Sequence, residues 1–197
     1  MGKIIIRGNN VWFSESEKRK KAVSSVPTPN AQTNTLCKSR NGRSEIAKQL
    51  AEKVESLKYE NPKLYYFASL QQNFGLRVSE VLNISSGDIQ PDGRIIIRGL
   101  KGSENRMVFS ESGRKFFLNC RKYSIKPFAD FDRYYINREY LKKSIFIKFA
   151  NSDKKAVTHC FRHLYLTNLN SDVDTDTKRK AIGQKSINST KHYEQKK

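Results

Sequence analysis

The chain has 197 residues, of which 38 are lysine or arginine and 19 are aspartate or glutamate, giving a formal net charge of +19 at pH 7. This length suits one folded domain, alone or with a short additional segment, and is too small for two full domains. Hydrophobic residues make up 37% of the chain, so most of it should fold. Such an excess of positive charge is typical of a surface that neutralises phosphates, and nucleic acid is the expected partner.

The sequence also disfavours membrane and secreted classes. No apolar run approaches the ~20 residues that a membrane-spanning helix needs, and the N-terminus has no charged-then-apolar signal pattern. We therefore expect a cytoplasmic protein with no membrane partner. The cysteines are odd in number and show no C-x-x-C pairing, so neither a disulfide framework nor a zinc ribbon is expected.

Residues 1–43 differ in composition from the rest of the chain. They begin with an isoleucine run typical of a strand, and residues 23–43 are rich in Ser, Thr, Asn and Pro, which favour turns and open chain. We expect a strand or arm and a flexible linker here, followed by one domain over 44–197. The pattern Ile-Ile-Ile-Arg-Gly at 4–8 recurs at 95–99, each time followed by Phe-Ser-Glu-Ser, which is either a partial duplication of a hairpin or chance.

Helical periodicity begins at Ser44, an expected N-cap, and an apolar stripe continues through Leu57. A second helix is expected from Asn61, with asparagine as cap and proline in the first turn, to Gly75, which suits a C-terminal stop. A short third helix should open directly after it, at Arg77. The backbone of Arg77 would then be fixed by a packed element on each side.

Two β-rich runs, 94–99 and 106–110, are separated by a polar segment that contains glycine, which predicts a hairpin with Lys101 at its tip. Helical patterns then return in further segments, namely 113–123, 137–149, 158–169, 176–182 and 187–193. The sequence therefore predicts an α+β fold: a mostly helical domain with a small antiparallel sheet of two or three strands.

His159 and Arg162 lie three residues apart among apolar side chains, so on a helix they would share one face and point at one anionic target. A guanidinium is planar, bidentate and always charged, which suits it to hold two phosphate oxygens. Arg162 and Arg77 are the candidates for such a clamp. Taken singly, either arginine is more simply explained as a surface salt bridge.

Tyr193 is the candidate nucleophile. A phenol has a pKa of about 10, so nearby cations would have to stabilise the phenolate before it attacks phosphorus. Lys101 could give a proton to the sugar oxygen that leaves, and His159 could share this acid–base work. Each residue also has a simpler interpretation: packing or disorder for the tyrosine, an exposed turn residue for the lysine and a partly buried, hydrogen-bonded side chain for the histidine.

A metal site is a further alternative, because His159 and His163 have the i, i+4 spacing of zinc proteases. Here, however, Cys160 occupies the place of the glutamate base, and Arg162 would repel a divalent cation. We therefore expect no metal.

Four motifs follow one another along the chain: G-L-R-x-S-E at 75–80, L-K-G at 100–102 after a β-run, H-x-x-R-H at 159–163 and I-G-Q-K-S-I-N-S-T-x-x-Y at 182–193. Together they resemble the signature of the tyrosine recombinases, the phage-integrase family, over residues 75–193. The resemblance implies the catalytic-domain fold of that family. It also assigns site residues: catalytic Arg77, Lys101, His159, Arg162, Gln184 and Tyr193, with Glu80 and His163 in support.

The reaction implied by this resemblance cuts one DNA strand through a covalent 3′-phosphotyrosine, frees a 5′-hydroxyl and rejoins the strand to a partner, without metal, ATP or another cofactor. Glu80 matches the acidic residue that helps hold the first arginine in the family. The implied partners are double-stranded DNA, further copies of the chain in a homotetramer on DNA, and accessory DNA-bending proteins. The protein would then be associated with the nucleoid.

Two features depart from the family pattern. Gln184 stands where the family usually has a histidine or tryptophan, and glutamine brings neither a titrating ring nor the bulk of an indole. The family also usually has a separate helical domain ahead of the catalytic one, whereas here only about 43 residues precede the first expected helix. In size the chain therefore resembles the short recombinases that invert fimbrial switches. Two alternatives stay open: a catalytically weakened DNA-binding accessory or regulatory protein of the same fold, and a type IB topoisomerase-like enzyme.

Overall fold

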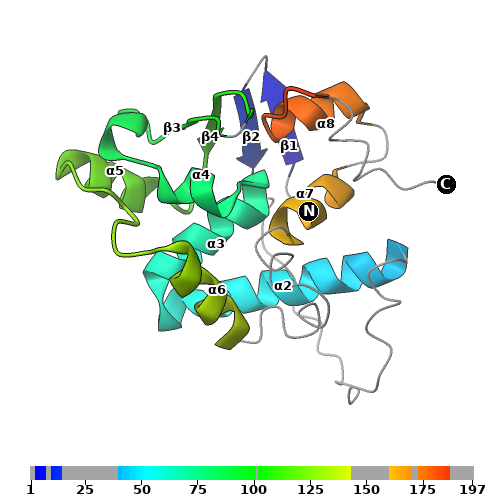
Figure 1. Ribbon diagram of the computed structural model, residues 1–197, viewed down its shortest axis with the longest axis horizontal. Coiled ribbons are helices and arrows are strands. Elements are labelled where there is room, and N and C mark those ends of the chain that lie inside the picture. The colour runs from blue at the N-terminus through cyan, green and yellow to red at the C-terminus, as the bar shows by residue number, and fades with distance from the viewer. Residues whose placement is uncertain are drawn as a thin grey trace.

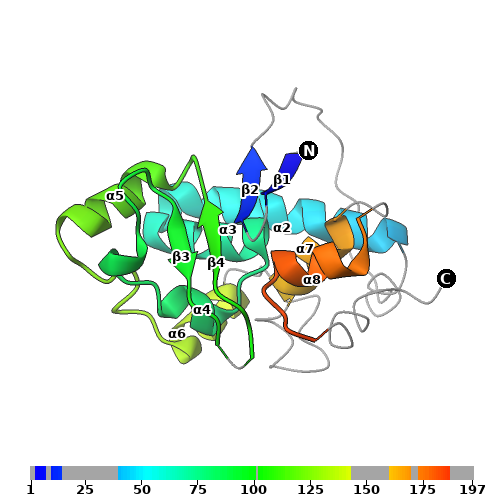
Figure 2. The same ribbon diagram turned by 90° about the horizontal axis from the view of Figure 1, so that it is seen from above.

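The computed structural model describes residues 3–7, 10–14, 40–100, 102–142, 160–169 and 173–186. Its elements in chain order are β1 (Lys3–Arg7), β2 (Asn10–Ser14), α2 (Arg40–Glu60), α3 (Pro62–Phe74), α4 (Val78–Leu82), the short 3-10 helix η1 (Ser86–Asp88), β3 (Ile95–Ile97), β4 (Arg106–Phe109), α5 (Arg114–Lys122), α6 (Arg133–Lys142), α7 (Cys160–Asn168) and α8 (Thr175–Ala181). The sheet lies between α5 at one end of the molecule and α8 towards the other (Figure 1, Figure 2). The predicted α+β class, mostly helical with a small sheet, is confirmed.

The sheet is wider than expected because the strand predicted near the N-terminus joins it as part of a hairpin. The strand order is β1-β2-β4-β3. Each hairpin, β1–β2 and β3–β4, is antiparallel, whereas the central pair β2–β4 is parallel, with Asn10 opposite Met107. The N-terminal hairpin and the hairpin predicted to carry Lys101 therefore share one sheet.

Both copies of the Ile-Ile-Ile-Arg-Gly pattern form hairpin strands, but their registers differ by one residue. Ile4 pairs with Phe13, whereas Ile95 pairs with Val108 and not with Phe109. A shift of one residue exchanges the two faces of a strand. The two hairpins are thus similar in sequence and topology without being superposable residue for residue.

The ends of α3 follow the predicted capping residues. The Asn61 side chain accepts a hydrogen bond from the Leu64 backbone N–H at 3.0 Å. At the other end Gly75 adopts a left-handed conformation, with φ of 61°, and its N–H donates to the Gln71 carbonyl at 2.9 Å. An Asn cap, a proline in the first turn and a glycine stop therefore define this helix, as predicted.

Two predicted helix starts were wrong. Ser44 is not a cap, because α2 already begins at Arg40 and runs through it. The helix predicted to start at Asn137 begins at Arg133. The reason is a local cap, since the Asp132 carboxylate accepts a hydrogen bond from the Tyr135 N–H at 2.6 Å. The expected helix over 187–193 lies outside the described residues.

The main core forms where α2 packs on α3 and α3 packs on α7. Leu50, Val54 and Leu57 of the predicted apolar stripe are all buried in it. A smaller cluster joins α7 to the end of α8 through Tyr165, Leu166, Leu169, Ala181 and Ile182. Among the described helices, none combines the length and apolar character that crossing a bilayer requires.

Candidate functional site

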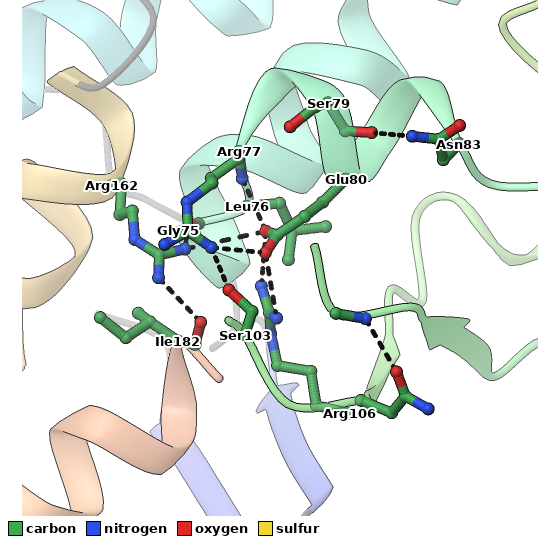
Figure 3. Close-up of polar contacts among 12 residues, drawn as sticks. Gly75, Leu76, Arg77, Ser79, Glu80, Asn83, Ser103, Arg106, Arg162 and Ile182 are labelled. Carbon is green, nitrogen blue, oxygen red and sulfur yellow. Dashed lines mark hydrogen bonds and ion pairs between the residues drawn. The ribbon is translucent and has the colours of Figure 1, made fainter. Parts of the chain in front are cut away.

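The carboxylate of Glu80 is the centre of the site (Figure 3). Its side chain has no exposed surface, and three guanidinium groups surround it: Arg77 Nη1 lies 2.9 Å from Oε1, Arg106 Nη2 lies 2.9 Å from Oε2 and Arg162 Nη1 lies 3.7 Å from Oε2. Three positive charges against one negative charge leave a formal excess of two positive charges. The cluster therefore favours the approach of an anion.

Arg77 is placed by the turn between α3 and α4. The buried Gln71 side chain donates from Nε2 to the Leu76 carbonyl at 3.2 Å, which fixes the residue before Arg77. The Arg77 backbone N–H donates to Glu80 Oε2 at 2.8 Å, so the same carboxylate holds both the backbone and the side chain of this arginine. About one fifth of the Arg77 side chain, 20%, is exposed and can meet a ligand.

Arg162 reaches the same carboxylate from α7 but is buried. Its Nη1 donates to the Gly75 carbonyl at 2.9 Å and its Nη2 to the Ile182 carbonyl at 2.8 Å. It thus ties the turn that precedes Arg77 to the end of α8 (Figure 3). The two arginines predicted to form a clamp are brought together, since both contact Glu80.

Burial raises the pKa of the Glu80 carboxyl, but the charge and hydrogen bond of Arg106, the backbone hydrogen bond of Arg77 and the charge of Arg162 outweigh it. The pKa of Glu80 is therefore lowered, and the group is ionised at neutral pH. Tyr165 on α7 behaves differently: burial raises its pKa to about 12, although Arg106 and Arg162 act in the opposite direction. Tyr165 is accordingly a neutral phenol and not a candidate nucleophile.

The loop of the hairpin predicted to carry Lys101 contacts the cluster. Ser103 Oγ accepts a hydrogen bond from Arg77 Nη1. Ser103 also pairs with Gln184 in an isolated antiparallel bridge, and the Glu104 N–H donates to the Gly183 carbonyl at 2.6 Å. The hairpin loop therefore lies against the segment that follows α8. Because Ser103 contacts Arg77 and pairs with Gln184, the backbone of Gln184 lies on the same side of the hairpin loop as the Arg77 site.

Four successive carbonyl groups, from Ile182 to Lys185, each accept a hydrogen bond. Arg162 donates to the first, the backbone of Glu104 to the second, and Arg179 Nη1 to the third and fourth at 2.7 and 3.2 Å. Arg179 also lies 3.5 Å from the Glu104 carboxylate. The beginning of the segment that leads to residue 193 is thus anchored to α7, α8 and the hairpin.

Of the predicted site residues, Arg77, Glu80, Arg162 and Gln184 are described by the structure, and Gln184 is buried. Lys101, His159, Tyr193 and the side chain of His163 lie outside the described residues. The catalytic roles of all these residues stay predictions, and so does the expectation that His159 and His163 hold no metal.

Sequence reasoning missed Arg106, Ser103 and Arg179. For Arg106 a signal existed: side chains alternate along a strand, and Arg106 occupies the same face as Val108, two residues later and buried. An arginine at an inward position needs a buried carboxylate to pair with. Ser103 carried no local signal, because its partners Arg77 and Gln184 lie in other parts of the chain. Arg179 has a local partner, Asp176, but that spacing gave no indication of its contact with Glu104 on the hairpin.

The fold and this cluster define an α+β protein built around three arginines that share one buried carboxylate. A sequence model of the phage integrase family matches residues 43–197. The chain therefore belongs to the phage integrase family, the DNA-binding tyrosine recombinases, and the family predicted from the motifs is confirmed.

Among solved structures the chain is similar to one titled "Crystal structure of XerA recombinase", with a TM-score of 0.54 and 20% sequence identity. The similarity covers 91% of this chain and 62% of that one, so the chain spans less than two thirds of that protein's length. At this identity the likeness concerns the fold. A comparison with curated proteins gave no match.

Proposed function

We propose that the protein is a site-specific recombinase that cleaves and rejoins DNA strands through a covalent 3′-phosphotyrosine at Tyr193. The observation that carries this proposal is the cluster in which Arg77 and Arg162 share one buried carboxylate with a third arginine. Phosphoryl transfer depends mainly on positioning and on fixed positive charge, and such a cluster supplies both without reorganisation at the moment of reaction.

The two proposed clamp arginines would contribute differently. Arg77 is partly exposed and held from its backbone, so it can bond a non-bridging phosphate oxygen directly. Arg162 is buried and would supply positive charge without touching the phosphate. A direct contact would require its guanidinium to give up the hydrogen bonds to the Gly75 and Ile182 carbonyls and to donate to phosphate oxygens in their place. Charge that develops on the phosphate in the transition state is stabilised in either case.

The remaining steps fall to residues outside the described part of the chain. As the Tyr193 oxygen bonds to phosphorus, the bond from phosphorus to the 5′ oxygen breaks, and Lys101 would give that oxygen a proton to form the 5′-hydroxyl. His159 would share the acid–base work by accepting the proton that the Tyr193 phenol loses as it attacks. Gln184 would donate an amide hydrogen bond to the phosphate. Rejoining reverses these transfers on a partner strand.

The proposed substrate is double-stranded DNA, bound by several copies of the chain, with residues 44–197 as the catalytic unit. Lysine and arginine contacts with phosphates would supply most of the affinity, which should therefore fall steeply with salt.

A library of randomised duplexes, each nicked once, tests the proposal whatever the sequence of the target site. Wild-type protein should form adducts that survive detergent, and mass spectrometry should find the DNA on the peptide containing Tyr193. Tyr193→Phe should abolish the adducts while DNA affinity stays within about threefold. Tyr134→Phe, which alters an exposed tyrosine of α6, is the matched control and should behave as wild type. Adducts that persist in Tyr193→Phe would remove this residue as the nucleophile.

The catalytically weakened accessory protein is the second candidate, and the buried Gln184 beside Ser103 favours it. If wild type forms no adduct and Gln184→His does, this second candidate replaces the first. Relaxation of a supercoiled plasmid that lacks any selected site would instead favour the topoisomerase-like alternative.

A further inference from the structure

Arg106 is the third guanidinium on Glu80, and its side chain is buried much more deeply than that of Arg77. Only 1% of its side chain is exposed, against 20% for Arg77. It faces both carboxylate oxygens, with Nη2 at 2.9 Å from Oε2 and Nη1 at 3.5 Å from Oε1. Arg106 has almost no exposed surface, and both of its Nη atoms face Glu80, so its contribution to the reaction would pass through the groups that it touches.

The same side chain packs against the segment that follows α8. A Cβ atom added at Gly183 would lie 2.6 Å from Arg106 Nη1, so the guanidinium fills the space that a side chain at residue 183 would need. Gly183 directly precedes Gln184. Arg106 also opens β4, where it pairs with Ile97 next to the loop of the hairpin predicted to carry Lys101. Three separate parts of the site thus meet at one arginine.

Electrostatics gives Arg106 a second function at Glu80. Among the described residues, the charged groups that face this carboxylate are Arg77 at the start of α4, Arg106 on β4 and Arg162 on α7. Burial pushes the pKa of Glu80 up, and Arg106 is the largest influence that pushes it down. Without Arg106, Glu80 would ionise less readily, and a protonated carboxyl is a weaker acceptor for the backbone and side chain of Arg77.

We propose that Arg106 is a positioning residue for the recombinase reaction: by bonding both oxygens of Glu80 and packing against Gly183, it fixes the first catalytic arginine and the hairpin relative to each other. The proposal rests on the proposed function for its cleavage readout. It is distinct from a role in DNA binding, because Arg106 has no surface on which DNA could bind.

Arg106→Met is the primary variant. Adduct formation on the duplexes selected by wild type should slow by about 10- to 100-fold at neutral pH, while DNA affinity stays within about threefold. Because Glu80 ionises again as pH rises, the deficit relative to wild type should shrink with increasing pH. A residue that only supports the fold would lower the rate without this pH dependence.

Two further variants sharpen the result. Arg106→Lys keeps a cation but loses the two-point contact, so it should give a smaller loss and a flat pH profile; it also decides the question if the methionine variant does not fold. Arg98→Met is the matched control, since Arg98 pairs with the buried Asp88 at 2.6 Å yet is itself 67% exposed. It should cleave at the wild-type rate. A lysine variant with the same pH-dependent deficit as the methionine variant would overturn the charge argument.

A direct measurement separates this proposal from the proposed function. The ¹³C signal of the Glu80 carboxyl, assigned with the help of Glu80→Gln, should titrate at higher pH in Arg106→Met than in wild type, whether or not the protein cuts DNA. The double variant with Glu80→Gln should cleave about as slowly as Glu80→Gln alone, because residues that act through one another are not additive. The proposal would be overturned if Glu80 titrated at the same pH in Arg106→Met and in wild type, or if the losses of cleavage rate in the two single variants added in the double variant. If wild type formed no adducts, only the proposed function would be refuted.

Discussion

Gly183→Ala should destabilise the protein more than Gly102→Ala, although both glycines have positive φ angles, 67° and 80°. An L residue in this region costs roughly 1–2 kcal/mol in backbone strain. Alanine also lowers the entropy of the unfolded chain, which returns roughly 0.4–1 kcal/mol. These two effects are common to both positions, so their difference isolates the contacts of the new methyl group.

Those contacts differ sharply between the two sites. At residue 183 the added Cβ would lie 2.6 Å from Arg106 Nη1 and 2.8 Å from the Glu104 carbonyl oxygen, whereas at residue 102 no atom lies within 4 Å. The Glu104 backbone is held by its own hydrogen bond to the Gly183 carbonyl, and the Arg106 guanidinium by Glu80, so neither can move cheaply. Overpacking of this kind costs roughly 1–3 kcal/mol, which is the expected gap between the variants.

Urea unfolding followed by far-UV circular dichroism measures this gap. The midpoint should fall further for Gly183→Ala with an unchanged m-value, and the melting temperatures should differ by about 2–4 °C for each kcal/mol. If the two variants unfold within about 0.5 kcal/mol of each other, the close packing of the hairpin against the segment after α8 is refuted.

Three further predictions concern the buried polar groups. The pKa of Glu80 is lowered in the folded protein, so ionised Glu80 stabilises the fold above its unfolded pKa of about 4.3, and this stabilisation is lost as pH falls through the folded pKa. The difference in unfolding free energy between wild type and Glu80→Gln, measured by urea titration, should therefore narrow below about pH 4. A difference that stays constant with pH would contradict this. Arg162→Lys cannot span the two carbonyls that the guanidinium bridges, and should lose about 1–3 kcal/mol in urea unfolding, whereas a loss near zero would exclude the bridge. Tyr140→Phe removes the 2.7 Å hydrogen bond to the buried Gln71 amide oxygen and should also lower the unfolding free energy by about 1–3 kcal/mol. Tyr59→Phe, at the surface, is the control and should change stability little. Equal melting temperatures for the two variants would show that the Tyr140 hydrogen bond contributes nothing to stability.

Features fixed by neighbouring residues were predictable from the sequence. The limits of α3 follow from Asn61 and Gly75, whose capping preferences act within one turn, and the structure has both caps. Ser44 was a poor guide to a helix start because a serine marks a cap only where the preceding backbone is not already helical. The helix expected over 137–149 begins earlier because Asp132 caps it ahead of the periodic apolar residues.

The site was predictable to the extent that motifs name residues, and no further. The motifs identified Arg77, Glu80 and Arg162, and the structure places all three in contact. They gave no indication that Arg162 is buried against two carbonyl groups, or that Arg106 completes the cluster. Those facts depend on how β4, α7 and the end of α8 meet, which no local pattern specifies.

The parallel pairing of β2 with β4 has a consequence for synthesis of the chain. Asn10 pairs with Met107, 97 positions further along, whereas each hairpin closes over a short loop. At roughly 5–20 residues per second, a ribosome needs about 5–20 s to deliver the second partner after the first. During that interval β2 cannot pair with β4, because β4 has not yet been synthesised. Completion of the sheet then also requires closure of a long loop, and such long-range parallel pairing is intrinsically slow.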